Sequence, residues 1–291
     1  MRILVTNDDG IDSVGLHVLA RTMCNHGDVV VLAPDREYSG SSASVGALHL
    51  MRPEVHRVTM SDVPETWTLN GPPALCVMFA RLGAFGPRFD LVVSGINPGA
   101  NVGRAVYHSG TIGACLTARI GGISGVAVSQ AVTGFGVEGQ GWDDMIADQK
   151  WESAAAVADV VVGALVADMP TEPVVVNLNV PNLVLDQIAG WAEAEVGLVP
   201  PRAVSTAVLE PIVGHEDAYN VRMAWGEEAD LPPHSDGAVI RDDRISVTYL
   251  SRLVADRRPD LTATEAALDG LFGDYSAAAP IPPRLMDVKR G

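Results

Sequence analysis

Residues 1–34 read MRILVTNDDGIDSVGLHVLARTMCNHGDVVVLAP, and this stretch is the one that decides the fold. A β-branched run at 3–5 stops at the turn sequence Asn-Asp-Asp-Gly of residues 7–10. Residues 15–26 carry apolar side chains at helical spacing. Residues 28–34 form a near-continuous apolar run, which is typical of a strand buried on both faces of a parallel sheet. A strand, a helix and a second strand in this order predict a βαβ unit.

The same alternation continues further along the chain. Strand-like runs occur at 91–93, 125–129 and 173–180, and helical patterns at 109–120 and 152–168. Strands that alternate with helices predict an α/β fold, a doubly wound and mainly parallel sheet with right-handed crossovers.

Two stretches break this alternation. Residues 133–148 are rich in glycine and acidic residues, and they are typical of a surface loop. From about residue 190 the pattern changes to short strands, prolines and acids, with a last helix near 262–272. We therefore expect a core domain over 1–190 and, over 191–291, a C-terminal extension that completes the fold with a hairpin or oligomerisation element.

The charge of the chain excludes some classes of function. The 291 residues include 20 Lys and Arg against 36 Asp and Glu, which gives a formal net charge of −16. A chain this acidic does not hold a polyanion through general electrostatics, so we expect no nucleic-acid-coating role. An anionic substrate would need local neutralisation by a metal ion, an arginine or a helix N-terminus.

The cysteines and the apolar runs indicate the compartment. Cys24, Cys76 and Cys115 form no CxxC pair, which favours a reducing environment over a disulfide framework or a structural zinc site. The apolar stretch at 154–167 is too short to span a bilayer, and the N-terminus lacks the pattern of a signal peptide. The sequence predicts a cytoplasmic protein without a membrane partner.

Polar side chains gather where the predicted strands end, which is where open parallel sheets bind ligands. They are Asn7, Asp8 and Asp9 after the first strand, Ser39 to Ser42 after the second, and Asn97 and Asn101 after the strand at 91–93. Adjacent carboxylates repel each other unless a cation or hydrogen-bond donors lie beside them. Carboxylate, amide and hydroxyl oxygens suit a hard divalent ion such as Mg²⁺ or Mn²⁺, which would also neutralise a phosphate and activate water.

Plainer interpretations of the same residues stay open. The sequence Asn-Asp-Asp-Gly is also typical of an ordinary turn. Ser109, before Gly110 and Thr111, is also typical of an ordinary helix N-cap. The same helix start would point its N–H groups at a nearby anion. Other catalytic schemes lack their motifs: the chain has no GxGxxG after the first strand, no GxxxxGK[ST], no GxSxG and no HExxH.

Four segments together resemble a known family in order and spacing. They are RILVTNDDGID at 2–12, VVVLAPDREYSGSSAS at 29–44, DLVVSGINPGANVG at 90–103 and YHSGTIGAC at 107–115. This combination is similar to the SurE family of survival-protein nucleotidases. Residues 174–190 and 235–250 resemble later segments of that family more loosely.

The resemblance implies a Rossmann-like, metal-binding catalytic core that hydrolyses nucleoside 5′- or 3′-monophosphates with one divalent ion per subunit, Mg²⁺ or Mn²⁺. By match to the family's motifs, the metal ligands would be Asp8, Asp9, Ser39 and Asn97. Asp8 or Asp9 would accept a proton. The phosphate pocket would be lined by Asn7, Gly40, Asn101, Ser109, Gly110 and Thr111. The family also implies a homodimer or homotetramer in which the C-terminal part is exchanged between subunits.

The sequence departs from the family pattern at three positions. Ala43 and Thr117 stand where the family often has an Asn and a Glu, and the segment around Ala74, residues 71–76, lacks the acid of the family's Gly-Thr-Pro-x-Asp-Cys. No metal ligand is lost, so we expect hydrolysis to survive. Two alternatives remain open: a broad-specificity phosphatase or exopolyphosphatase that uses the same site, and a catalytically weak member that acts as a binding or assembly protein.

Overall fold

The computed structural model describes residues 1–50, 52–133, 142–199, 201–202, 204–251, 260 and 262–272. The chain divides into two units, Met1–Ser251 and Arg252–Gly291. The second unit contains the helix α7 (Thr262–Phe272), at the place where the sequence predicts the last helix.

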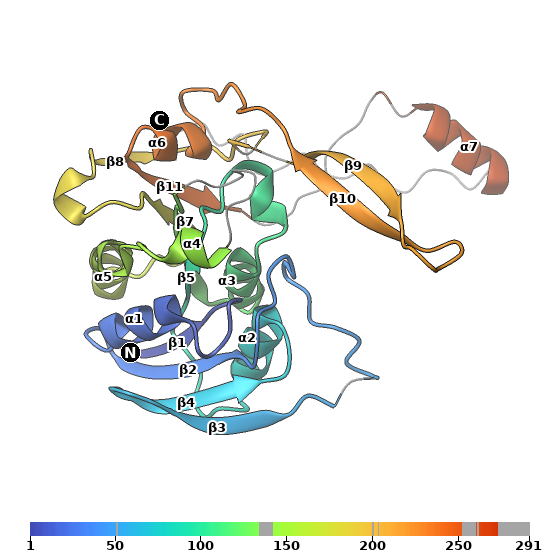
Figure 1. Ribbon diagram of the computed structural model, residues 1–291. Helices are drawn as coiled ribbons and strands as arrows, with labels where there is room; N and C mark the ends of the chain where they lie inside the picture. The colour runs from blue at the N-terminus through green and yellow to red at the C-terminus, as the bar shows by residue number, and fades with distance from the viewer. Residues whose placement is uncertain are drawn as a thin grey trace. The chain divides into compact units, whose positions relative to one another are not determined.

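A nine-stranded sheet forms the centre of the first unit, in the order β3-β4-β2-β1-β5-β6-β7-β11-β8 (Figure 1). Its strands are β1 (Arg2–Thr6), β2 (Asp28–Pro34), β3 (Val55–Met60), β4 (Val63–Leu69), β5 (Leu91–Pro98), β6 (Ser124–Gln130), β7 (Val175–Val180), β8 (Trp191–Glu193) and β11 (Ile245–Leu250). The six adjacent strands β4, β2, β1, β5, β6 and β7 run parallel to one another. β3 and β11 are antiparallel to β4 and β7, respectively. The predicted mainly parallel α/β sheet is confirmed.

Helices cover both faces of the sheet, and successive residues of its central strands point to opposite sides and pack against them. Ile3 and Val5 pack with α1 (Val14–Met23) and α5 (Trp151–Ala167). Leu4, between them, packs on the other face. There it meets α2 (Pro73–Arg81) and α3 (Gly110–Ile120), and Figure 1 shows the two helix pairs on opposite sides of the sheet.

Two stretches differ from the sequence analysis or go beyond it. The hairpin β3–β4 and the helix α2 were not predicted from the sequence; for β3 the reason is that it is largely exposed and shows no apolar alternation. Within the predicted loop at 133–148, residues 142–146 form the short helix α4 (Trp142–Ile146), so the loop interpretation is wrong there. Residues 134–141 lie outside the described part of the chain.

The C-terminal third contributes both to the main sheet and to a separate ribbon. β11 pairs with β7 and β8, and the short helix α6 (Asp236–Arg241) precedes it. β9 (Val204–Pro211) and β10 (Tyr219–Trp225) form a two-stranded antiparallel sheet of their own. Short 3-10 helices, η1 (Gly103–Tyr107) and η2 (Leu185–Gln187), complete the unit. Among the described residues, no helix has the length and apolar character needed to cross a membrane.

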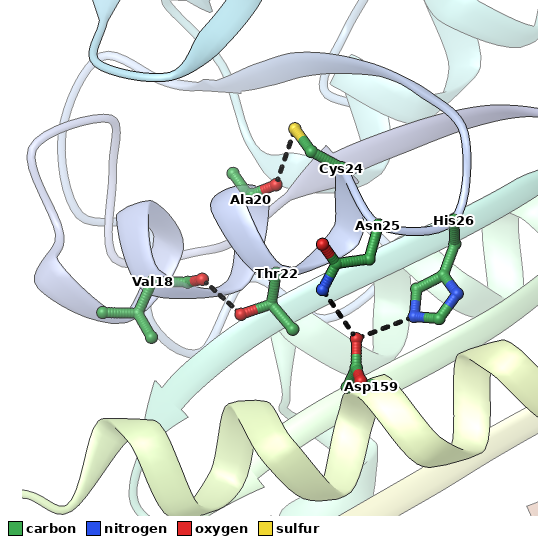
Figure 2. Close-up of polar contacts among 7 residues, drawn as sticks. All are labelled: Val18, Ala20, Thr22, Cys24, Asn25, His26 and Asp159. Atoms are coloured by element: carbon green, nitrogen blue, oxygen red, sulfur yellow. Dashed lines mark hydrogen bonds and ion pairs between the residues drawn. The ribbon is translucent and has the colours of Figure 1, made fainter.

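The end of α1 is tied to the middle of α5 by polar contacts (Figure 2). Asn25 Nδ2 and His26 Nε2 both donate to Asp159 Oδ1, at 3.2 and 2.8 Å. The hydrogen bond from Asn25, followed by that from His26 and its charge, holds the pKa of Asp159 below its usual value, against an opposing effect of desolvation.

Candidate functional site

The predicted site residues lie at the carboxyl ends of the central strands. β1 and β5 are neighbours in the sheet, but α1 follows β1 on one face and α3 follows β5 on the other. Such a switch point opens a crevice beyond the strand ends, and this is where ligands bind in open α/β sheets. The loops after β1, β2 and β5 meet here.

Asp8 is the buried centre of the site, with only 3% of its surface exposed. Its Oδ1 accepts a 2.6 Å hydrogen bond from Thr111 Oγ1, and its Oδ2 accepts a 3.1 Å bond from the N–H of Gly110. Burial raises the pKa of Asp8 although these bonds stabilise the charged form. A Cβ on Gly110 would lie 2.8 Å from Asp8 Oδ2, so this close approach requires glycine.

Asp9 supplies the second carboxylate. Its Oδ2 is buried and has no hydrogen-bond partner. Burial, then the charge of Asp8 and then that of Glu37, raise the pKa of Asp9 well above its usual value. Among the described residues, neither aspartate forms an ion pair with a basic side chain.

The loop after β2 lies beside these aspartates. The N–H of Tyr38 donates to the carbonyl oxygen of Asp8 at 2.7 Å. Ser39 is exposed, and its Oγ donates to Glu37 Oε1 at 2.8 Å. Gly40 follows with a φ of +78° and open space around it.

Ser41 lies over the start of α3. Its Oγ is buried without a hydrogen-bond partner. This oxygen lies 2.9 Å from the place that a Cβ of Gly110 would take. Ser41 belongs to the run of serines that the sequence places after β2, whereas Glu37 was not predicted; its only signal is its position two residues before Ser39.

Asn97 comes from the end of β5 and is partly buried. Its Nδ2 donates to the carbonyl oxygen of Gly99 at 2.7 Å. This bond fixes the orientation of the side-chain amide and leaves Oδ1 available to a ligand. The structure gives no direct bond between Asn97 and either aspartate.

The remaining predicted residues are held by bonds within the protein. Asn7 Nδ2 donates to Gly10 O at 3.0 Å, and Asn7 Oδ1 is buried without a partner. Ser109 caps α3, because its Oγ accepts from the N–H of Ile112 at 3.1 Å. Asn101 Nδ2 donates to Ser129 Oγ at 2.9 Å, so this side chain braces β6.

The three departures from the family pattern lie in α3, in α2 and in the loop after β2. Thr117 Oγ1 donates to Gly113 O inside α3 at 2.8 Å, Ala74 is buried in α2, and Ala43 is exposed. None of the three forms a hydrogen bond to Asp8 or Asp9.

The chemistry of the site is that of an oxygen-rich, negatively charged cluster of side chains. Three buried oxygens without partners come from its residues, namely Asn7 Oδ1, Asp9 Oδ2 and Ser41 Oγ. Buried carboxylates in such a place need a compensating charge. No three His, Cys, Asp or Glu side chains gather anywhere in the described part of the chain, so a metal here would depend on amide and hydroxyl oxygens as well.

Comparisons with known proteins point in one direction. The family model described as "Survival protein SurE" matches residues 3–199. A protein named 5′-nucleotidase SurE from Legionella pneumophila (strain Lens) is 35% identical over 256 residues, which cover 86% of this chain and 90% of that protein. One of the same name from Alkalilimnicola ehrlichii is 32% identical over 252 residues, covering 85% of this chain and 88% of that one.

A solved structure shows the same fold. The crystal structure of a SurE protein from Aquifex aeolicus superposes with a TM-score of 0.71 at 26% sequence identity. The match covers 92% of this chain and all of that chain (100%).

Proposed function

This chain belongs to the SurE family, and from that premise we propose that it hydrolyses nucleoside 5′- and 3′-monophosphates to nucleoside and phosphate with the help of a divalent metal ion. The named relatives, 5′-nucleotidases, support this reaction class. The domain that carries it would be the core at 1–190, completed by the segment 191–291.

One observation carries the proposal. Asp8 and Asp9 are adjacent at the strand ends and free of basic partners among the described residues; Asp8 is buried, and Asp9, half-buried, has a buried Oδ2 without a hydrogen-bond donor. Burial without neutralisation makes such a pair unfavourable. A bound cation supplies the charge that is missing.

The donor atoms fit a hard divalent cation, Mg²⁺ or Mn²⁺, one per subunit. We propose that Asp8, Asp9, Ser39 and Asn97 hold it, with Asn97 offering Oδ1 because its Nδ2 is used by Gly99. When bound, the ion would neutralise phosphate charge, polarise the phosphoryl group and activate water.

The protein's own groups would divide the remaining work. Thr111 and Gly110 fix the Asp8 carboxylate, so Asp8 keeps its orientation during the reaction. Asp9, whose Oδ2 has no donor, would orient the attacking water and accept its proton. We propose that the phosphate lies among Asn7, Gly40, Asn101, Ser109, Gly110 and Thr111, at the start of α3.

The test is phosphate release from nucleoside 5′- and 3′-monophosphates after chelation and after Mg²⁺ or Mn²⁺ is added back. Turnover that depends on the metal and prefers nucleotides supports the proposal. Equal turnover of a simple aryl phosphate or of polyphosphate would favour a broad-specificity phosphatase instead. Folded protein that binds the metal but turns over none of these substrates would favour a binding or assembly role.

Assembly and location form part of the same proposal. We propose a homodimer or homotetramer that associates through the C-terminal ribbon β9–β10, whose residues are all exposed in the single chain. The three cysteines are free, and two of them are buried, in keeping with a cytoplasmic location.

A further inference from the structure

The loop at 99–103, which follows Asn97, is held at every second residue by a different element. The N–H of Gly99 donates to Gln130 O at the end of β6, at 2.7 Å. The N–H of Asn101 donates to Asn179 Oδ1 on β7, also at 2.7 Å. The N–H of Gly103 donates to both carboxylate oxygens of Asp236, at 3.1 and 3.0 Å.

Asparagines on β7 strengthen the middle of this loop. The carbonyl oxygen of Asn101 accepts from Asn177 Nδ2 at 3.0 Å and from Asn179 Nδ2 at 3.3 Å. Both asparagines are completely buried. These bonds satisfy the Asn101 backbone, so the loop is a fixed part of the fold rather than a free surface turn.

Asp236 is an unusual group to hold the far end. It is the first residue of α6, in the C-terminal segment, and it is fully buried. Its Oδ1 also accepts from the N–H groups of Gly197 and Gly237, at 3.0 and 2.8 Å. In the described part of the chain it has no basic partner, so backbone N–H groups alone compensate its charge.

The loop is connected directly to a proposed metal ligand. Asn97 Nδ2 donates to the carbonyl oxygen of Gly99, the first residue that the neighbouring elements hold. The position of that carbonyl decides which way the Asn97 amide turns, and therefore whether Oδ1 faces the site. A shift of the loop would turn or release this oxygen.

We propose that Asp236 is a positioning residue for the metal site: by holding Gly103 it keeps the loop at 99–103 in place, and the loop in turn orients Asn97 Oδ1. The inference rests on the proposed function, in which Asn97 is a metal ligand. It assigns to the C-terminal segment a role in metal affinity, although none of its residues is proposed to touch the metal.

The test measures Mn²⁺ binding to the full-length folded protein, to Asp236→Asn and to Asp236→Ala. Electron paramagnetic resonance detects the free Mn²⁺ that remains in each titration. The Asn variant keeps Oδ1 as an acceptor for Gly197, Gly237 and Gly103, but an NH₂ group replaces Oδ2, the second and shorter of the two acceptors of the Gly103 N–H. We expect its Mn²⁺ affinity to fall about tenfold, the size that loss of an outer-shell contact gives, and that of Asp236→Ala to fall further. The metal concentration needed for half-maximal hydrolysis should rise by the same factors, with kcat largely restored at saturating metal.

Ser235→Ala is the matched control. Ser235 Oγ caps α6 by accepting from the N–H of Ala238 at 3.3 Å, and it has no bond to the loop at 99–103. We expect this variant to lower the melting temperature while leaving Mn²⁺ affinity within about twofold of the wild type, since it loses the cap and a bond to Pro232 O but no bond to the loop at 99–103.

Each outcome decides the question. Wild-type Mn²⁺ affinity in both Asp236 variants, or an equal loss of affinity in Ser235→Ala, would overturn the positioning role. If Asp236→Ala does not fold, Asp236→Asn decides alone. A wild-type protein whose Mn²⁺ binding is absent, or is unchanged by Asp9→Asn, would overturn the proposed function and this inference with it.

Discussion

Gly110 shows how a single missing side chain shapes the site. The place that its Cβ would take lies 2.8 Å from Asp8 Oδ2 and 2.9 Å from Ser41 Oγ. At that distance neighbouring atoms must shift. The absence of a side chain therefore lets the start of α3 contact the carboxylate through the N–H of Gly110.

We predict that Gly110→Ala displaces the Asp8 carboxylate and lowers kcat/KM for nucleotide hydrolysis about a hundredfold, since small misplacements of reacting groups have effects of this size. Gly270→Ala in α7 is the control, because nothing lies within 4 Å of its added Cβ. Steady-state kinetics of both variants test the prediction, which an active Gly110→Ala protein would refute.

Replacing the Asp9 carboxylate should lower activity but raise the stability of the metal-free protein. We predict that Asp9→Asn lowers hydrolysis by on the order of a thousandfold and abolishes Mn²⁺ binding. In metal-free protein the same change should raise the melting temperature by about 2–4 °C, because it removes a buried charge next to Asp8. Calorimetry after chelation measures the second effect; a lower melting temperature there would show that Asp9 is already compensated within the protein.

At the scale of elements, one exposed carboxylate, that of Asp159, adds a polar contact to the apolar packing between α1 and α5. The lowered pKa of Asp159 means that the folded state favours its charged form. This contribution to stability is present above the usual pKa of 3.8 and is lost as the pH falls through the lower pKa of the folded state. With the Asp159 side chain 39% exposed, solvent screening keeps its value to at most about 1 kcal/mol.

We therefore predict that Asp159→Asn is less stable than the wild type at about pH 6, and that the difference shrinks toward zero as the pH falls below 3.8 and through the lowered pKa of folded Asp159. Urea unfolding across this pH range measures it. A stability difference that stays constant at low pH would mean that packing around Asp159, rather than its charge, holds the two helices together.

The elements that the sequence predicts well are those with strong apolar periodicity. The strands β1, β2 and β7 and the helix α5 pack in the core. Burial requires apolar side chains at regular positions, and that spacing is visible in the sequence. β3 was not predicted because it is an exposed edge strand, and an exposed strand does not require regularly spaced apolar residues. The position of Asp8 and Asp9 at a strand end could be predicted because they directly follow the apolar run of β1.

The contacts inside the site could not be predicted by the same reasoning. Thr111 meets Asp8 across 103 positions of the chain, and Gly103 meets Asp236 across 133. No local pattern encodes such pairs, because three-dimensional packing brings them together. The buried hydroxyl of Ser41, which has no hydrogen-bond partner, is likewise a result of packing that its sequence neighbours do not indicate.

On the scale of the whole molecule, the ribbon β9–β10 has one apolar and one polar face. Cross-strand neighbours share a face, and Leu209 with Val221 and Ala207 with Met223 make one of them apolar. Glu210 and Arg222 form an ion pair on the other. A two-stranded ribbon is marginally stable by itself, so a second copy of the chain is the cover that we expect.

We predict that Met223→Lys, at a side chain 65% exposed in the single chain, reduces the oligomer to smaller species. Thr206→Lys, on the polar face beside Ala224, should leave the assembly intact. Light scattering after size-exclusion chromatography gives both masses. An unchanged mass for Met223→Lys would place the interface elsewhere.

The position of β11 between β7 and β8 has a consequence for the order in which the molecule is made. β7 ends at Val180 and is buried along its whole length, yet the strand that pairs with its outer edge begins only at Ile245. While the ribosome produces the residues between them, the nascent chain presents an open, apolar strand edge. During that interval the unpaired edge of β7 is open to wrong pairing, and this exposure ends once β11 has emerged and paired with it.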